Sequence, residues 1–70
     1  EEKILAALDS ALAQLAETDR ALLEAKYFSN VSVRTLAAKL SLSEKAVESR
    51  LTRARVELRR HLLAALARHE

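Results

Sequence analysis

The stretch from Ser43 to Leu66 has apolar residues at helical spacing and no residue that would interrupt a helix. Val47, Leu51, Ala54 and Leu58 fall within about 60° of one another when residues are placed at 100° intervals. The chain has no proline or glycine at all. The spacing therefore predicts a long helix that starts after Ser43, continues past Leu58, and turns this apolar stripe toward a core.

The opposite side of this helix carries short polar groups framed by arginines. It comprises Lys45, Glu48, Ser49, Thr52, Arg53 and Val56, with Arg50 and Arg55 at its two borders. Guanidinium groups neutralise phosphate, and small side chains let a helix approach base edges in the DNA major groove. The pattern favours a DNA-binding helix. A solvated amphipathic helix whose arginines form surface pairs, such as Glu44 with Arg55 or Glu57 with Arg53, remains the alternative.

Size and composition predict one small domain, residues 1–70, with a core of leucine and alanine at close interhelical distances. The chain has 70 residues, half of them apolar, yet Tyr27 and Phe28 are its only aromatic residues. It starts at Glu1 rather than at methionine, which suggests a fragment of a longer protein.

Several classes of function find no support in the sequence. Without cysteine there are no disulfides or thiolate metal sites, which is compatible with a cytoplasmic protein. No apolar run approaches the ~18 residues of a membrane span. His61 and His69 lie about two helical turns apart, too far to share a metal. No serine, histidine and acid are arranged as a catalytic site, and no glycine-rich loop exists. We therefore predict no enzyme, cofactor, metal or small-molecule substrate.

Charge is distributed unevenly along the chain. Residues 1–30 contain three basic and six acidic side chains, a net charge of −3, whereas residues 31–70 contain nine basic and four acidic ones, a net charge of +5. A basic second half beside an acidic first half predicts that a polyanion binds at one end of the domain.

Two further helices are predicted in the first half of the chain. Residues 2–15 place Ile4, Leu8, Leu12 and Leu15 on one face, with Leu5 beside them. A weak break follows at residues 16–19, where Thr18 or Asp19 can cap a second helix that runs from residue 19 to residue 27 and buries Leu22, Leu23 and part of Tyr27.

A third helix and a short turn lead into the long helix. Asn30 can adopt a left-handed conformation that ends the second helix, and Ser32 can cap a helix over residues 33–40. Its inward residues are expected to be Val33, Leu36, Ala37 and Leu40. In the turn at residues 41–43, Leu42 is expected in the core and Ser43 as the cap of the last helix. We interpret the result as an all-α, four-helix domain with a helix-turn-helix and a long C-terminal recognition helix; a plain αα-hairpin is the alternative.

The segment Val47 to Arg55, V-E-S-R-L-T-R-A-R, resembles region 4 of bacterial RNA polymerase sigma factors, particularly the extracytoplasmic-function group. The similarity extends over Leu15 to Leu62. It implies a domain that docks its last helix in the major groove of the promoter −35 element of double-stranded DNA. It also implies attachment to the RNA polymerase core through the β-subunit flap, and an anti-sigma factor as a further partner.

The resemblance implies a role for individual side chains on the face that helical spacing had selected. The candidates for reading bases are Glu48, Ser49, Thr52 and Arg53. The candidates for phosphate contacts are Arg34, Lys45, Arg50 and Arg55.

The chain departs from the family pattern at several positions. Asn30 and Ser41 stand where the family often has glycine, so Ser41 is expected to adopt a positive φ. Ala46 stands where threonine is common, and Glu48 where lysine or arginine is common. These two changes should weaken phosphate binding, although the Glu48 carboxylate can accept a hydrogen bond from cytosine N4.

Two alternatives remain open at this point. The pattern S-E-K-x-V at Ser43 to Val47 also resembles LuxR-like transcriptional regulators, although R-A-R at Arg53 to Arg55 argues against that group. The other alternative is a helical protein-interaction or dimerisation module with no useful DNA affinity. Salt-dependent binding to a duplex discriminates the two classes.

Overall fold

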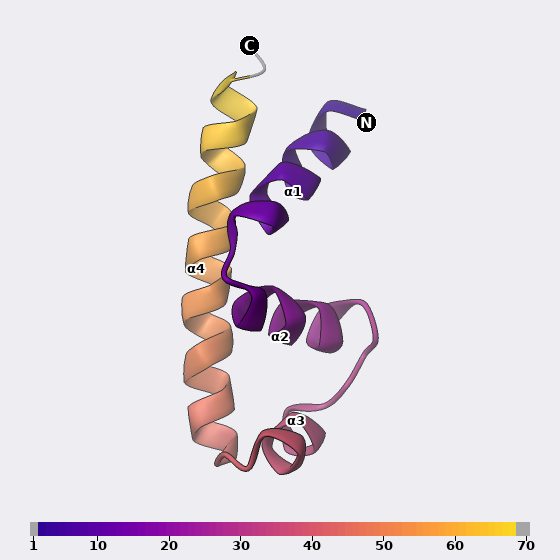
Figure 1. Ribbon diagram of the computed structural model, residues 1–70, viewed down its shortest axis with the longest axis vertical. Helices are drawn as coiled ribbons and strands as arrows, with labels where there is room; N and C mark the ends of the chain where they lie inside the picture. Colours follow the sequence, from indigo (N-terminus) through magenta and orange to yellow (C-terminus); the bar gives the residue numbers. More distant parts are fainter. Residues whose placement is uncertain (1, 69–70) are drawn as a thin grey trace.

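The computed structural model describes residues 2–68 as four α-helices without strands, which confirms the predicted fold class. Their bounds are α1 Glu2–Gln14, α2 Glu17–Tyr27, α3 Val33–Leu40 and α4 Glu44–Arg68. The 25 residues of α4 extend about 37 Å, close to the 42 Å long axis of the molecule. Figure 1 shows α1 beside the C-terminal half of α4, with α2 and α3 beside its N-terminal half. The continuous helix past Leu58 was correctly predicted.

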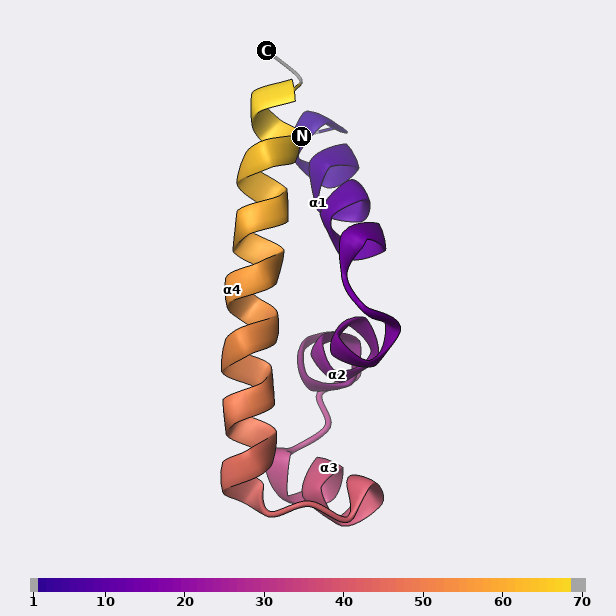
Figure 2. The same cartoon turned by 60° about the vertical axis from the view of Figure 1, so that its left-hand side comes forward.

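The contact between α1 and α4 is built on alanine. Ala7 and Ala11 of α1, and Ala65 of α4, are each 0% exposed. Methyl side chains at a helix contact let the two axes approach closely. The two helices run antiparallel, so the start of α1 and the end of α4 lie at the same end of the molecule (Figure 2). Among the described residues, every buried apolar residue except Val47 is leucine or alanine, as the composition predicted.

The predicted inner face of α1 was partly wrong. Ile4 is 53% exposed and Leu8 and Leu12 are only half-buried, while Ala7 and Ala11 are fully buried. Large apolar residues dominate a helical-wheel prediction, but close packing on α4 is possible only where α1 presents small ones. The leucines therefore lie at the edge of the contact.

The start of α2 also differs from the prediction. The break between α1 and α2 is present, but the helix begins at Glu17, and Ala16 occupies the N-cap without a side-chain hydrogen bond. Neither Thr18 nor Asp19 is the cap. Glu17 and Asp19 instead lie in the first turn, where negative charge interacts favourably with the helix dipole.

The helix-turn-helix follows the predicted boundaries. The Ser32 hydroxyl accepts a hydrogen bond from the Thr35 backbone N–H at 3.1 Å, and Ser43 accepts one from Ala46 N–H at 3.0 Å. Ser41 is left-handed, with φ 57° and ψ 42°, and Asn30 also has a φ of 57°. Leu42 packs against the core as predicted, but Leu40, the last residue of α3, is 47% exposed.

Replacing Ser41 with glycine should stabilise the protein. The left-handed conformation is unfavourable for a residue with a Cβ atom, and glycine avoids this penalty. The gain in stability is partly offset because glycine makes the unfolded chain more flexible. We expect a gain of about 1 kcal/mol, or about 4–8 °C in melting temperature. Thermal unfolding followed by circular dichroism measures it. Asn30→Gly is the matched control, and its melting temperature should rise less, since asparagine tolerates this conformation. An unchanged or lowered melting temperature for Ser41→Gly would contradict the prediction.

Candidate nucleic-acid interface

The outward face of the N-terminal half of α4 brings the four predicted base-reading residues together. They are all exposed, and with one lysine they line a single shallow depression, formed by Lys45, Glu48, Ser49, Thr52 and Arg53. On the opposite side of the same helix, Val47, Leu51 and Ala54 are buried in the core. The helix therefore has the orientation that reading a groove requires.

The predicted phosphate contacts surround this face at different places. Arg50 is exposed at one border, beside Asp19 at the start of α2. Arg55 lies at the other border, next to Tyr27 at the end of α2. Arg34 is exposed in the first turn of α3 and does not line the depression on α4. The structure thus places cations on either side of the polar face rather than in a single cluster.

Arg55 is held by a partner that the sequence did not reveal. Its Nη1 donates a hydrogen bond to the Tyr27 hydroxyl, and its Nη2 donates one to Thr52 Oγ1 at 3.2 Å. The pairing with Glu44 is not formed. Tyr27 and Arg55 are 28 residues apart in sequence, so no helical spacing could have connected them. A guanidinium has five N–H donors, so three remain for a phosphate.

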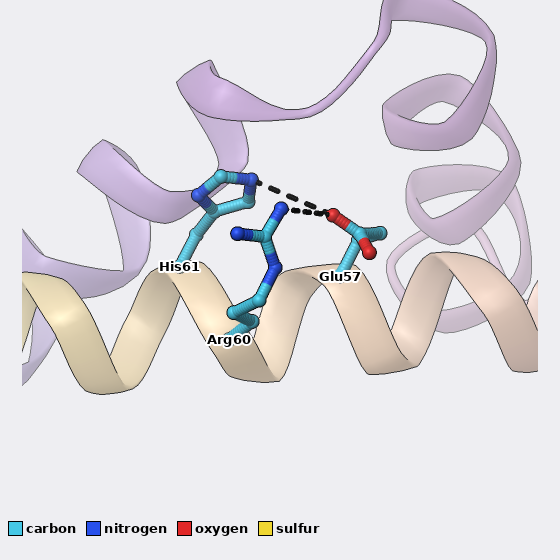
Figure 3. Close-up of polar contacts among 3 residues, drawn as sticks. All are labelled: Glu57, Arg60 and His61. Atoms are coloured by element: carbon cyan, nitrogen blue, oxygen red, sulfur yellow. Dashed lines mark hydrogen bonds and ion pairs between the residues drawn. The ribbon is translucent and has the colours of Figure 1, made fainter.

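Arg53 lies on the same face without an ion-pair partner in residues 2–68. The surface pair with Glu57 is not formed. The Glu57 carboxylate instead binds Arg60 on the next turn, with 2.6 Å between Oε1 and Nη2, and lies 3.8 Å from His61 Nε2 (Figure 3). The Arg53 guanidinium is thus left available for a ligand.

The Glu57 carboxyl has a lowered pKa. The hydrogen bond from Arg60 is the largest cause of the lowered pKa, followed by the positive charge of Arg60. Slight desolvation acts in the opposite direction, and His61 adds the smallest lowering. A folded-state pKa below the ordinary value of 4.5 means that the pair stabilises the protein above about pH 4.5. This stabilisation is lost as the pH falls through the folded-state pKa.

Glu57→Gln should therefore lower the free energy of unfolding slightly at neutral pH and by less in acid. The effect is small because the pair is exposed to solvent. Urea unfolding at pH 7 and at pH 3 measures it. Arg60→Gln should give a similar loss at neutral pH, and the two losses should not add in the double variant. An equal loss at both pH values would show that the pair is not its source.

Other kinds of site are not seen in the described part of the chain. Residues 2–68 contain no group of three or more His, Cys, Asp or Glu side chains arranged to hold a metal. Of the two histidines in the spacing prediction, His61 lies in α4 and His69 lies outside the described residues. No helix among residues 2–68 has the length and apolar character to cross a membrane.

The short helix α3 leads through a tight turn into the long helix α4, which has a core-facing stripe and an exposed polar and basic face. These features define the helix-turn-helix class of DNA-binding domains. Within this class, residues 5–58 match the family model for sigma-70, region 4, and the chain belongs to that family. It is a family of sigma-factor DNA-binding domains and not of enzymes. No curated protein and no solved structure matches the chain. The family match ends at Leu58, whereas α4 continues to Arg68.

Proposed function

We propose that residues 1–70 act as a single domain, the C-terminal domain of an extracytoplasmic-function sigma factor, which binds the promoter −35 element to direct transcription initiation. One observation carries the proposal: Glu48, Ser49, Thr52 and Arg53 are exposed together on a helix whose opposite side buries Val47, Leu51 and Ala54 in the core. In this proposal they read bases, while Arg34, Lys45, Arg50 and Arg55 bind phosphates. The family match favours this function over that of a LuxR-like regulator.

The proposed protein partners are the β-subunit flap of RNA polymerase core and an anti-sigma factor, both in the cytoplasm. An apolar groove between α1, α2 and α4 supports a protein contact away from the base-reading face. Its lining consists of Leu8, Leu12, Leu23, Tyr27, Phe28, Arg55 and Leu58. Phe28 is 67% and the adjacent Tyr27 53% exposed there, so the groove presents neighbouring large apolar side chains to solvent, as contact surfaces do.

Duplex binding measured by fluorescence anisotropy over a range of salt concentrations tests the DNA-binding proposal. Four phosphate contacts, each with a slope of about −0.9, predict a log–log slope of roughly −3.6. A helical interaction module would show no such dependence. Selection from a randomised duplex library, with and without core polymerase, then identifies the bound sequence and shows whether it is a −35 element.

A matched pair of variants makes this test specific. Arg50→Ala should reduce the magnitude of the slope by about 0.9. Arg68→Ala removes the same charge from an exposed position in the last turn of α4 and should leave the slope unchanged. Equal effects of the two variants would indicate attraction to overall charge instead of docking of the proposed face.

A further inference from the structure

The hydroxyl of Thr52 is already engaged by the protein, although the side chain is exposed in the middle of the proposed base-reading face. Thr52 Oγ1 donates its hydrogen to the Glu48 carbonyl oxygen at 2.9 Å. The same oxygen accepts a hydrogen bond from Arg55 Nη2 at 3.2 Å. A threonine hydroxyl has one hydrogen and two lone pairs, so it retains no donor and a single lone pair.

Contacts on both sides hold this arrangement in place. Bonding of a threonine hydroxyl to the carbonyl four residues earlier is a recurring local geometry in helices. Arg55 cannot turn away from Thr52 freely, because its other terminal nitrogen donates to the Tyr27 hydroxyl on α2. The chain of hydrogen bonds from Tyr27 through Arg55 and Thr52 to the Glu48 carbonyl therefore links the recognition helix to α2.

This geometry limits what Thr52 can recognise. In the major groove, N7 of both purines, guanine O6 and thymine O4 are acceptors and need a donor, which Thr52 no longer has. The amino groups of adenine and cytosine can donate to its one remaining lone pair, but a single acceptor does not distinguish these two bases. The part of the side chain without a polar partner is the γ-methyl group. The apolar group that a base offers in the major groove is the C5-methyl of thymine.

We infer that Thr52 is a specificity-determining residue that selects thymine through contact between its γ-methyl group and the thymine C5-methyl group. The inference rests on the proposed function, because it assumes that this face of α4 enters the major groove. It assigns the hydroxyl of Thr52 to positioning Arg55 and the methyl group to reading the base.

The test uses the duplex that the wild-type chain selects from a randomised library, with each thymine replaced in turn by deoxyuridine. Uracil lacks only the C5-methyl group, so no hydrogen bond of the base changes. At one thymine, the substitution should weaken binding by about fourfold, the value of one apolar carbon removed from water. At every other thymine, the effect of the uracil substitution on binding should be the same in the wild-type chain and in the Thr52 variants.

Two substitutions separate the methyl group from the hydroxyl. Thr52→Val keeps the methyl and should retain the roughly fourfold preference for thymine over uracil, whereas Thr52→Ser keeps the hydroxyl and should lose it. Circular dichroism checks that both variants, altered at an exposed position, remain folded. A wild-type chain insensitive to every uracil, or a Thr52→Ser variant that retains the preference, overturns the inference and leaves DNA binding intact. Absence of salt-dependent duplex binding overturns the proposed function as well.

Discussion

Arg53→Ala is expected to weaken binding to the selected duplex by about 1–3 kcal/mol, or roughly 5- to 150-fold. Arg53 lies among the four proposed base-reading residues and forms no ion pair in residues 2–68, since Glu57 binds Arg60 instead. Its guanidinium fork is therefore available to donate two hydrogen bonds to guanine O6 and N7, the commonest specific contact in the major groove. Competition between the selected duplex and an unrelated one measures the loss and shows whether sequence discrimination falls with it.

Arg50→Ala is the comparison for Arg53→Ala on the same helix. Arg50 lies at the border of the face, beside Asp19, where a phosphate contact is expected. Its loss should weaken binding to the selected and unrelated duplexes alike. An Arg53→Ala variant that binds its selected duplex normally, or one that loses affinity equally for every sequence, would remove the base-reading role from Arg53.

Leu51→Ala is expected to cost about 2–5 kcal/mol of stability, enough to unfold much of the protein. Leu51 is 2% exposed and is one of the two largest fully buried side chains. It packs in a cluster that includes Leu22 and Leu23 of α2 and Leu36 of α3. Truncation leaves a cavity where three helices meet, and a domain of this size has little stability in reserve. Urea unfolding followed by far-ultraviolet circular dichroism measures the loss.

Leu63→Ala makes the same chemical change on the same helix at a position that is 57% exposed. It should alter the free energy of unfolding by less than about 0.5 kcal/mol. Leu51→Ala should also reduce DNA binding, but only by the fraction of molecules that unfold, so the folded remainder keeps its sequence preference. Equal stability losses in the two variants would show that Leu51 does not lie at the centre of the core.

The turns and caps of the helix-turn-helix were predictable from short segments. Ser32 and Ser43 cap the helices that follow them, and Asn30 and Ser41 have the positive φ expected at positions where the family often has glycine. Each of these features depends on hydrogen bonds or steric contacts within a few residues. The sequence pattern was also sufficient to predict the exposed face of α4, because a periodic apolar stripe leaves its opposite side to solvent.

Packing between distant segments determined the features that sequence patterns missed. Ala7 and Ala11, rather than Ile4, became the inner face of α1, because close approach to α4 needs small side chains on both helices. The contact between Tyr27 and Arg55, which engages Thr52, joins residues with no shared periodicity. Short-range hydrogen bonds and helical periodicity depend on residues that are close in sequence, so they can be predicted from it. Contacts between helices depend on the relative rotation and spacing of the helices, which the packing of the whole core determines.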